Sequence, residues 1–182
     1  MGEFSMLRPS NGKKTILLLS DDLRLHSGIA TMSREFVVGT AHIFNWVQLG
    51  SAIGHPDQGK IFDVSDDVNR EREITDANVK VIPWNGYGDS NILRKLLADI
   101  QPDAVLHFTD PRFWQWLYAM EREIRQQCPL LYYSVWDDVP VPHYNLSSYG
   151  SCDLVLGISK QSHNIHKIVL EDGGFNVVDL TK

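Results

Sequence analysis

Side chains that could do chemistry gather in the segments that follow short apolar runs. Ser27 and Gly28 follow the first such run, His107 closes another, and Trp136 and Asp137 follow a third. A glycine at a helix start lets backbone N–H groups approach an anion, and a histidine at a strand end can exchange a proton with a ligand. An aromatic ring beside a carboxylate suits a sugar, because the ring packs on C–H groups and the carboxylate accepts hydroxyl hydrogens.

More aromatic and acidic side chains occur in the same kind of segment. Trp84, Tyr87, Asp110 and Tyr144 all lie just beyond apolar runs. If these runs are strands of one sheet, the four side chains can reach one edge of it. Asp110 precedes a proline, so helix capping is an alternative role for it. A buried imidazole bonded to a neighbouring group is the alternative for His107.

Several common site motifs are absent from the sequence. Neither a G-x-G-x-x-G nor a G-x-x-x-x-G-K-[ST] segment occurs, and there is no G-x-S-x-G elbow. Asp21 and Asp22 resemble the magnesium-binding pair of receiver domains, but no aspartate ends the run 79–82, where that fold keeps its phosphoacceptor. His163 and His166 have no further metal ligands at suitable spacing, so they predict a solvated helix face.

Apolar runs and amphipathic segments alternate along the chain. Runs without polar alternation are typical of strands that are buried on both faces. The alternation predicts an α/β fold, a doubly wound, Rossmann-like parallel sheet of six or more strands with helices on both faces. Residues 50–60 are expected to form a loop, and no element is assigned to 63–73. The expected strands cover 16–19, 43–49, 79–82, 103–108, 130–135 and 154–158, and the expected helices begin near 28, 90, 111 and 160.

Length and composition favour a single domain over residues 6–182. The net charge of −6, from 17 basic and 23 acidic residues, disfavours nucleic acid as a partner. No apolar run approaches the ~20 residues that cross a bilayer, so no transmembrane segment is expected. The 2 cysteines fit reduced thiols, and we expect a cytoplasmic protein. Met1–Ser5 is expected to be a remnant of an expression vector and is left out of the fold.

Three stretches together resemble the family 4, or group 1, glycosyltransferases of the GT-B fold. Residues 27–31 resemble the glycine loop of that family, and 102–107 resemble its fourth strand, which ends in a histidine. Residues 142–145 and 152–160 resemble its D-x-[VIL]-x-x-x-S strand. The family usually has two glycines where this chain has a serine and a glycine. The second domain of the family, with its donor nucleotide site and E-x7-E motif, is not found, so the chain is expected to be the N-terminal half of the GT-B fold, the acceptor-side domain.

The resemblance implies transfer of a sugar, with retention of configuration, from a nucleotide sugar to a sugar or glycoconjugate acceptor. It implies no metal and no other cofactor. His107 would be catalytic through contact with the transferring sugar, and Ser27 and Gly28 would face the donor phosphates. The implied acceptor-binding residues are Trp84, Tyr87, Asp110, Trp136, Asp137 and Tyr144.

The same resemblance implies that this chain is inactive alone, because the basic residues that steady the leaving diphosphate belong to the second domain. Self-association through the exposed inter-domain face is a further expectation. Two alternatives come from other classes of protein. One is a non-catalytic α/β module that binds a sugar or a nucleotide, and the other is a separate small α/β enzyme.

Overall fold

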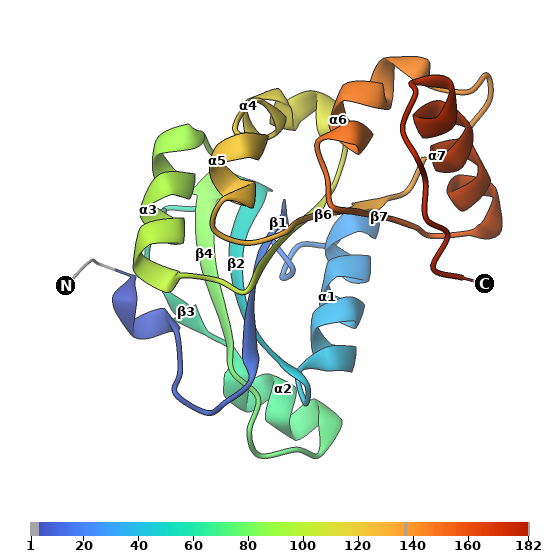
Figure 1. The fold of residues 1–182 in the computed structure, drawn as a ribbon. Helices are drawn as coiled ribbons and strands as arrows, with labels where there is room; N and C mark the ends of the chain where they lie inside the picture. The colour runs from blue at the N-terminus through green and yellow to red at the C-terminus, as the bar shows by residue number, and fades with distance from the viewer. Residues whose placement is uncertain (1–3, 137, 182) are drawn as a thin grey trace.

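The computed structural model describes residues 4–136 and 138–181. Within them, seven strands form one sheet in the order β3-β4-β2-β1-β5-β6-β7 (Figure 1). All neighbouring strands are parallel except β3 and β4. The strands are β1 (Lys14–Asp21), β2 (Phe44–Ile53), β3 (Phe62–Asp63), β4 (Val79–Asn85), β5 (Ala104–Phe108), β6 (Leu130–Ser134) and β7 (Leu154–Gly157). The predicted α/β class and the parallel sheet of at least six strands are confirmed.

Helices connect the strands along the chain. The helices are α1 (Gly28–Thr40), α2 (Ser65–Arg72), α3 (Ser90–Ile100), α4 (Gln115–Ala119), α5 (Glu121–Arg125), α6 (Leu146–Gly150) and α7 (Lys160–Asp172). The 3-10 turns are η1 (Ser5–Leu7), η2 (Pro111–Trp114) and η3 (His143–Asn145). The single helix expected from residue 111 is therefore divided into η2, α4 and α5. Among the described residues, no helix is both long enough and apolar enough to cross a membrane.

Strand β1 lies at the centre of the sheet, between β2 and β5. Ile16 and Leu18 pack into the apolar cluster that includes α1 and α2, whereas Leu17 and Leu19 pack into the cluster that includes α3, α4 and α5. Successive side chains of a strand point to opposite faces, so a strand covered on both sides has no polar position. This explains why the run 16–19 is apolar without alternation.

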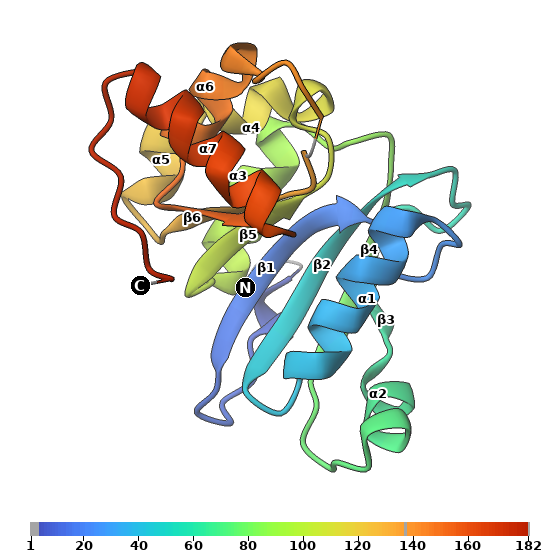
Figure 2. The same ribbon diagram turned by 90° about the vertical axis from the view of Figure 1, so that its right-hand side faces the viewer.

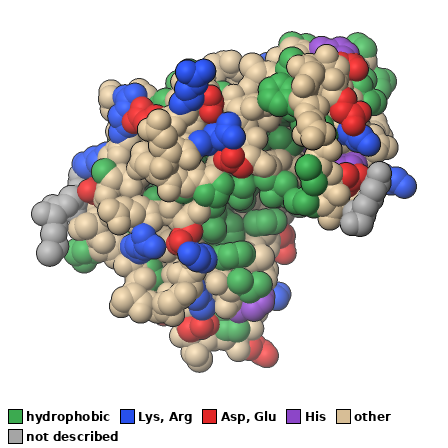
Figure 3. Space-filling view, viewed as in Figure 1, with side chains coloured by type: hydrophobic (Ala, Val, Ile, Leu, Met, Phe, Trp, Pro, Cys, Tyr) green, Lys and Arg blue, Asp and Glu red, His purple; other side chains and the backbone are tan. Residues whose placement is uncertain are grey.

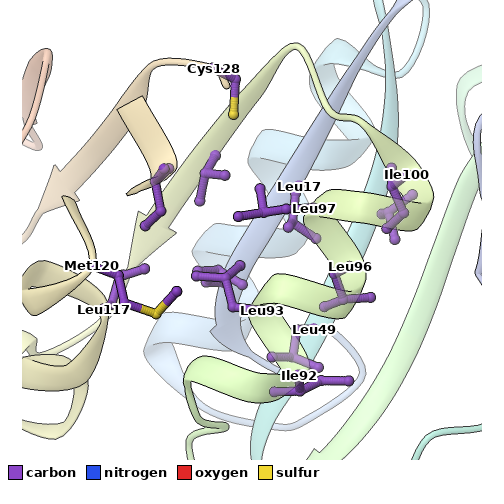
Figure 4. Packing of buried hydrophobic residues seen from close by; sticks show 14 of the residues in the cluster. Leu17, Leu49, Ile92, Leu93, Leu96, Leu97, Ile100, Leu117, Met120 and Cys128 are labelled. Atoms are coloured by element: carbon purple, nitrogen blue, oxygen red, sulfur yellow. The ribbon is translucent and has the colours of Figure 1, made fainter. Parts of the chain in front are cut away.

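Helix α3 covers one face of the sheet through a single apolar stripe. Ile92, Leu93, Leu96 and Leu97 are buried, and they point towards β1 and β2 (Figure 4). Asp89 caps the helix, since its carboxylate accepts hydrogen bonds from the backbone N–H groups of the first turn. The spacing of the apolar residues therefore predicts this helix correctly.

Helices α1 and α2 cover the other face (Figure 2). Ser27 caps α1 as predicted, with its hydroxyl oxygen accepting from the backbone N–H of Ala30 at 3.1 Å. Helix α2 was not assigned from the sequence, because it buries only Ser65 and Val68 and is otherwise charged. With so little apolar surface, it carries no clear helical periodicity.

Strand β2 continues past the point where the sequence predicts a loop. The loop was expected from residue 50, but the strand runs to Ile53. Strand β4 likewise continues through Pro83, which has no N–H to donate but accepts a hydrogen bond from the backbone N–H of Gly59. Neither Gly50 nor Pro83 ends its strand, because glycine keeps both backbone hydrogen-bonding groups and proline loses only its own N–H.

Phe4, the first described residue, takes part in the fold. Phe4 is only 2% exposed and belongs to the cluster under α3. Its backbone N–H donates to Asp99 at 3.1 Å, and the ammonium group of Lys95 lies 5.0 Å from the centre of its ring. Phe4 and Ser5 were left out of the fold in the sequence analysis, and the structure corrects this whatever their origin. An aromatic ring beside an open apolar helix face is buried wherever the chain can reach it.

The C-terminal segment 175–181 runs beside β7 in the same direction. The ring of Phe175 lies against Gly150, ahead of β7, and the carboxylate of Asp179 lies 3.4 Å from Nε2 of His163, which packs near the end of β7. A cavity of about 1210 Å³ separates this segment from β7 and α7. Within the described residues, β7 therefore pairs only with β6 and its outer edge is unpaired.

Candidate functional site

A cavity of about 350 Å³ opens at the carboxyl ends of β5 and β6, beside the start of α1. We call it the edge cavity. The chain leaves β1 towards β2 on one side and leaves β5 towards β6 on the other, so the connections diverge between β1 and β5. Ligands of open parallel sheets bind at such points. The edge cavity is lined by Ile29, Thr109, Asp110, Pro111, Tyr132, Val135, Trp136 and Asp138.

The start of α1 leaves room for a ligand to approach the backbone closely. No heavy atom lies within 4 Å of the position that a Cβ atom on Gly28 would occupy, and the neighbouring Ile29 lines the edge cavity. The Ser27 hydroxyl is already engaged, because it caps α1 and also donates to Oδ2 of Asp21 at 3.4 Å. Gly28 is therefore the more accessible of the two residues predicted to face a donor.

Asp21 was not predicted as a site residue, yet it links two of the site segments. Its carboxylate accepts from Ser27 and from the hydroxyl of Thr109, the latter at 3.5 Å. Partial burial raises the pKa of Asp21, while these two hydrogen bonds lower it. A carboxylate at this helix end opposes a bound phosphate by charge, so it counts against the predicted phosphate contact. Its position as the last residue of β1 is the signal that could have found it.

Asp110 combines the two roles considered for it. Its carboxylate accepts from the backbone N–H of Arg112 at 2.9 Å, which caps η2, and it lines the edge cavity. The guanidinium group of Arg112 donates to both carboxylate oxygens and holds the pKa of Asp110 below its usual value. Asp110 is therefore an ionised, oriented carboxylate at neutral pH.

Trp136 forms one wall of the edge cavity. Tyr144 stands edge-on to its indole, with 5.6 Å between the ring centres, and is 66% exposed. The indole Nε1 of Trp136 is buried and has no hydrogen-bond partner among the described residues. Asp137 lies outside the described residues. The next residue, Asp138, lines the cavity although it was not predicted to do so.

A second aromatic surface lies on the same edge of the sheet. Tyr87 stacks on Phe113, with ring centres 4.7 Å apart and planes 8° apart, and Phe113 is 53% exposed. Burial raises the pKa of Tyr87, and the charges of Asp21 and Asp110 add to this effect, which places Tyr87 near the edge cavity. Phe113 was missed because its spacing fits a helix stripe equally well.

Trp84 does not join this group. Its ring packs against Gly59 and the cluster under α3, at the end of β4. Strands β2 and β1 separate β4 from β5 in the sheet. Of the described residues predicted to bind an acceptor, Asp110 and Trp136 line the edge cavity, and Tyr87 and Tyr144 lie beside it.

The imidazole of His107 lies in the core and is bonded to a neighbouring group, which is the alternative role considered for it and not an exposed position at the ligand edge of the sheet. Its side chain is fully buried, with Nδ1 lying 2.7 Å from the hydroxyl oxygen of Tyr118. The ring stacks on Tyr132 at 5.1 Å and lies 5.0 Å from Trp114. Burial lowers its pKa to about 3, so the imidazole is neutral at physiological pH. The physical reason is that the ring points to the face of the sheet that η2 and α4 cover, where Trp114 and Tyr118 pack against it.

His107 nevertheless lies directly behind the cavity wall. Tyr132 stacks on its ring and also lines the edge cavity. Nε2 of His107 is buried without a hydrogen-bond partner among the described residues. Contact with a transferring sugar stays a prediction, and in this geometry it would require Tyr132 to move.

Metal and thiol chemistry receive no support within residues 4–136 and 138–181. No group of three or more potential metal ligands occurs there. The predicted solvated face for His163 and His166 is wrong for the second of these, because His166 is only 4% exposed and packs edge-on to Tyr149. Burial lowers its pKa to about 4. Cys128 and Cys152 are both free.

Comparison with known protein families, with curated proteins and with solved structures found no match to this chain.

Proposed function

We propose that this chain is the N-terminal, acceptor-side domain of a retaining, nucleotide-sugar-dependent glycosyltransferase with the GT-B fold. The observation that carries the proposal is the edge cavity, in which an aromatic wall and oriented carboxylates meet where the chain connections diverge. The resemblance of residues 27–31, 102–107 and 152–160 to family 4 enzymes supports the same assignment.

The order of the strands supports the proposed fold family. Without the short β3, the parallel strands follow the spatial order β4-β2-β1-β5-β6-β7, which is 3-2-1-4-5-6 in chain order. This is the order of Rossmann-like sheets. Helices α1 and α2 pack on one face, and α3, α4 and α5 pack on the other. We infer that the sheet is doubly wound, as the GT-B fold requires of each half.

The proposed division of roles follows from the side chains at the cavity. Trp136 offers a flat apolar surface for the C–H groups of an acceptor sugar, and Asp110 offers oxygens to its hydroxyl hydrogens. The donor is proposed to approach the backbone of Gly28, where the space is open. His107 is proposed to act from behind Tyr132, as a positioning residue or, after movement of that ring, in direct contact with the donor sugar.

Charge at the cavity explains why the isolated chain is proposed to be inactive. The guanidinium of Arg112 is bound to Asp110, and Arg24 is bound to Asp22. Neither is free to neutralise a leaving diphosphate, whose developing charge must be stabilised during transfer.

The test is a titration of the chain with the neutral disaccharide maltose and, separately, with UDP-glucose. The indole N–H signals of the 5 tryptophans are followed by NMR, with Trp136→Phe used to assign one of them. We expect maltose to shift the Trp136 signal with millimolar affinity, and Trp136→Ala to abolish binding while the matched variant Trp84→Ala retains it. Sugar transfer from UDP-glucose should be undetectable. Absence of any sugar response, with tight nucleotide binding instead, would favour the nucleotide-binding module, and robust turnover would show that the donor site is misplaced.

A further inference from the structure

We propose that the edge cavity selects an uncharged sugar ring and excludes anionic sugars such as uronic acids and sugar phosphates. This inference rests on the proposed function, since it names the class of acceptor that the cavity takes. It adds Asp138 and Asp21 to the residues that determine specificity.

The volume and the walls of the edge cavity suit a sugar ring. About 350 Å³ is near the lower end for ligand pockets and accommodates one or two sugar rings. Ile29, Pro111 and Val135 provide apolar contact, as does the indole of Trp136. A sugar ring has apolar C–H faces and a polar circumference, so it matches walls of mixed character.

The charged groups around the cavity are mostly carboxylates. Asp110 and Asp138 line it, and Asp21 is joined to it through the hydroxyl of Thr109. Among the described residues that line the cavity, only Asp110 has a cationic partner, the Arg112 guanidinium, which donates to both of its carboxylate oxygens. The net charge facing a ligand among the described residues is therefore negative. An anionic group placed there meets electrostatic repulsion from these carboxylates at short range.

The lining carboxylates also suit the hydroxyl groups of a sugar as hydrogen-bonding partners. Carboxylate oxygens only accept, so they require a ligand that donates, and sugar hydroxyls do so.

The experiment compares two sugars that differ only at C6, which carries a neutral hydroxymethyl group in one and a carboxylate in the other. Methyl glucoside and the methyl glycoside of glucuronic acid are titrated into the full chain at pH 7 and low salt, with the Trp136 indole signal as the readout. We expect methyl glucoside to bind at least tenfold more tightly than the glucuronide, because the carboxylate at C6 of the glucuronide is repelled by the carboxylates of the cavity.

A charge variant tests the cause of the discrimination. Asp138→Asn should reduce the preference for the neutral glycoside several-fold, because the change removes one negative charge from the wall of the edge cavity. Asp138 is exposed and asparagine is also polar, so the fold should be kept. Asp66→Asn, a matched change on the exposed face of α2, should leave the preference unaltered. Added salt should reduce the difference in affinity between the two glycosides in the native chain, because salt screens the repulsion between carboxylates.

The outcomes separate this inference from the proposed function. Equal or tighter binding of the glucuronide, or a preference that Asp138→Asn leaves intact, overturns the charge selection while sugar binding stands. Failure of both glycosides to bind overturns the charge selection and the sugar-binding function together.

Discussion

At the scale of single residues, His107 shows how a polar side chain at the end of a strand can belong to the core. Its ring is packed among Trp114, Tyr118 and Tyr132, and only Nδ1 has a hydrogen-bond partner. A neutral imidazole is the form that this apolar setting favours, because burial penalises the charged form. The His107 side chain therefore contributes to the stability of the fold, and its part in the proposed sugar transfer stays a prediction.

We expect His107→Ala to lower the free energy of unfolding by about 2–4 kcal/mol, since the change creates a cavity and leaves the Tyr118 hydroxyl without its partner. Urea denaturation followed by circular dichroism measures this. His42→Ala, which alters an exposed side chain, should change the free energy by less than about 0.5 kcal/mol. An unchanged stability in His107→Ala would show that the ring is not packed as described.

Two buried histidines predict a loss of stability in mild acid. The folded chain keeps His107 neutral down to a pKa of about 3 and His166 down to about 4, whereas unfolded histidine titrates near 6.5. Below pH 6.5 the unfolded state therefore binds more protons than the folded state, and stability falls as pH falls. Between pH 7 and pH 5 the loss should be about 2 kcal/mol per histidine.

Denaturation curves at pH 7, 6 and 5 measure that slope. His166→Gln should make the fall in stability about half as steep, since one of the two protons is then not taken up. A slope that is the same in the variant and in the native chain would contradict the burial of His166.

At the scale of elements, the sequence predicts some segments well and others poorly, for physical reasons. Strand β1 and helix α3 bury most of their surface, so apolar pattern alone identifies them. Helix α2 buries two residues and leaves no such pattern. Of the candidate site, the segments after the strands were predictable from topology. The direction of the His107 ring was not, because it depends on where a strand ends and on which turn covers it.

Strand β2 offers a sharp test of packing at Gly50. A Cβ atom on Gly50 would lie 2.7 Å from Oδ2 of Asp22, a buried carboxylate held by Arg24. We expect Gly50→Ala to destabilise the fold by about 1–3 kcal/mol, as overpacking does. Thermal denaturation provides the measurement. Gly54→Ala is the matched control, because nothing lies within 4 Å of its Cβ position, and it should change stability little.

At the scale of the whole molecule, apolar surface remains open on one side of the sheet. Figure 3 shows apolar side chains gathered in a band below β6 and β7. On the α1 side of these strands, Leu131, Tyr133 and Leu156 are only partly buried. Exposed apolar bands of this kind often mark contact surfaces. The self-association expected from the sequence therefore stays a prediction, which sedimentation over a range of protein concentrations can test.

The N-terminal residues should matter to the whole fold although they lie outside the sheet. Phe4→Ala should lower the free energy of unfolding by about 2–4 kcal/mol, because a buried aromatic ring is lost from the cluster under α3. Chemical denaturation measures the loss, with Met6→Ala as control, since Met6 is 88% exposed. Equal stability of the two variants would mean that the first residues are not held against α3.

The placement of β1 between β2 and β5 has a consequence for how the molecule opens. Both backbone edges of β1 are hydrogen-bonded, and its amides lie under helices on both faces, so they can reach solvent only when the whole sheet separates. In the part of the chain that the structure describes, strand β7 has one unpaired edge, and its side chains are only half-buried. Amide hydrogen exchange should therefore proceed from β7 inwards, with Leu17 and Leu18 among the last sites to incorporate deuterium.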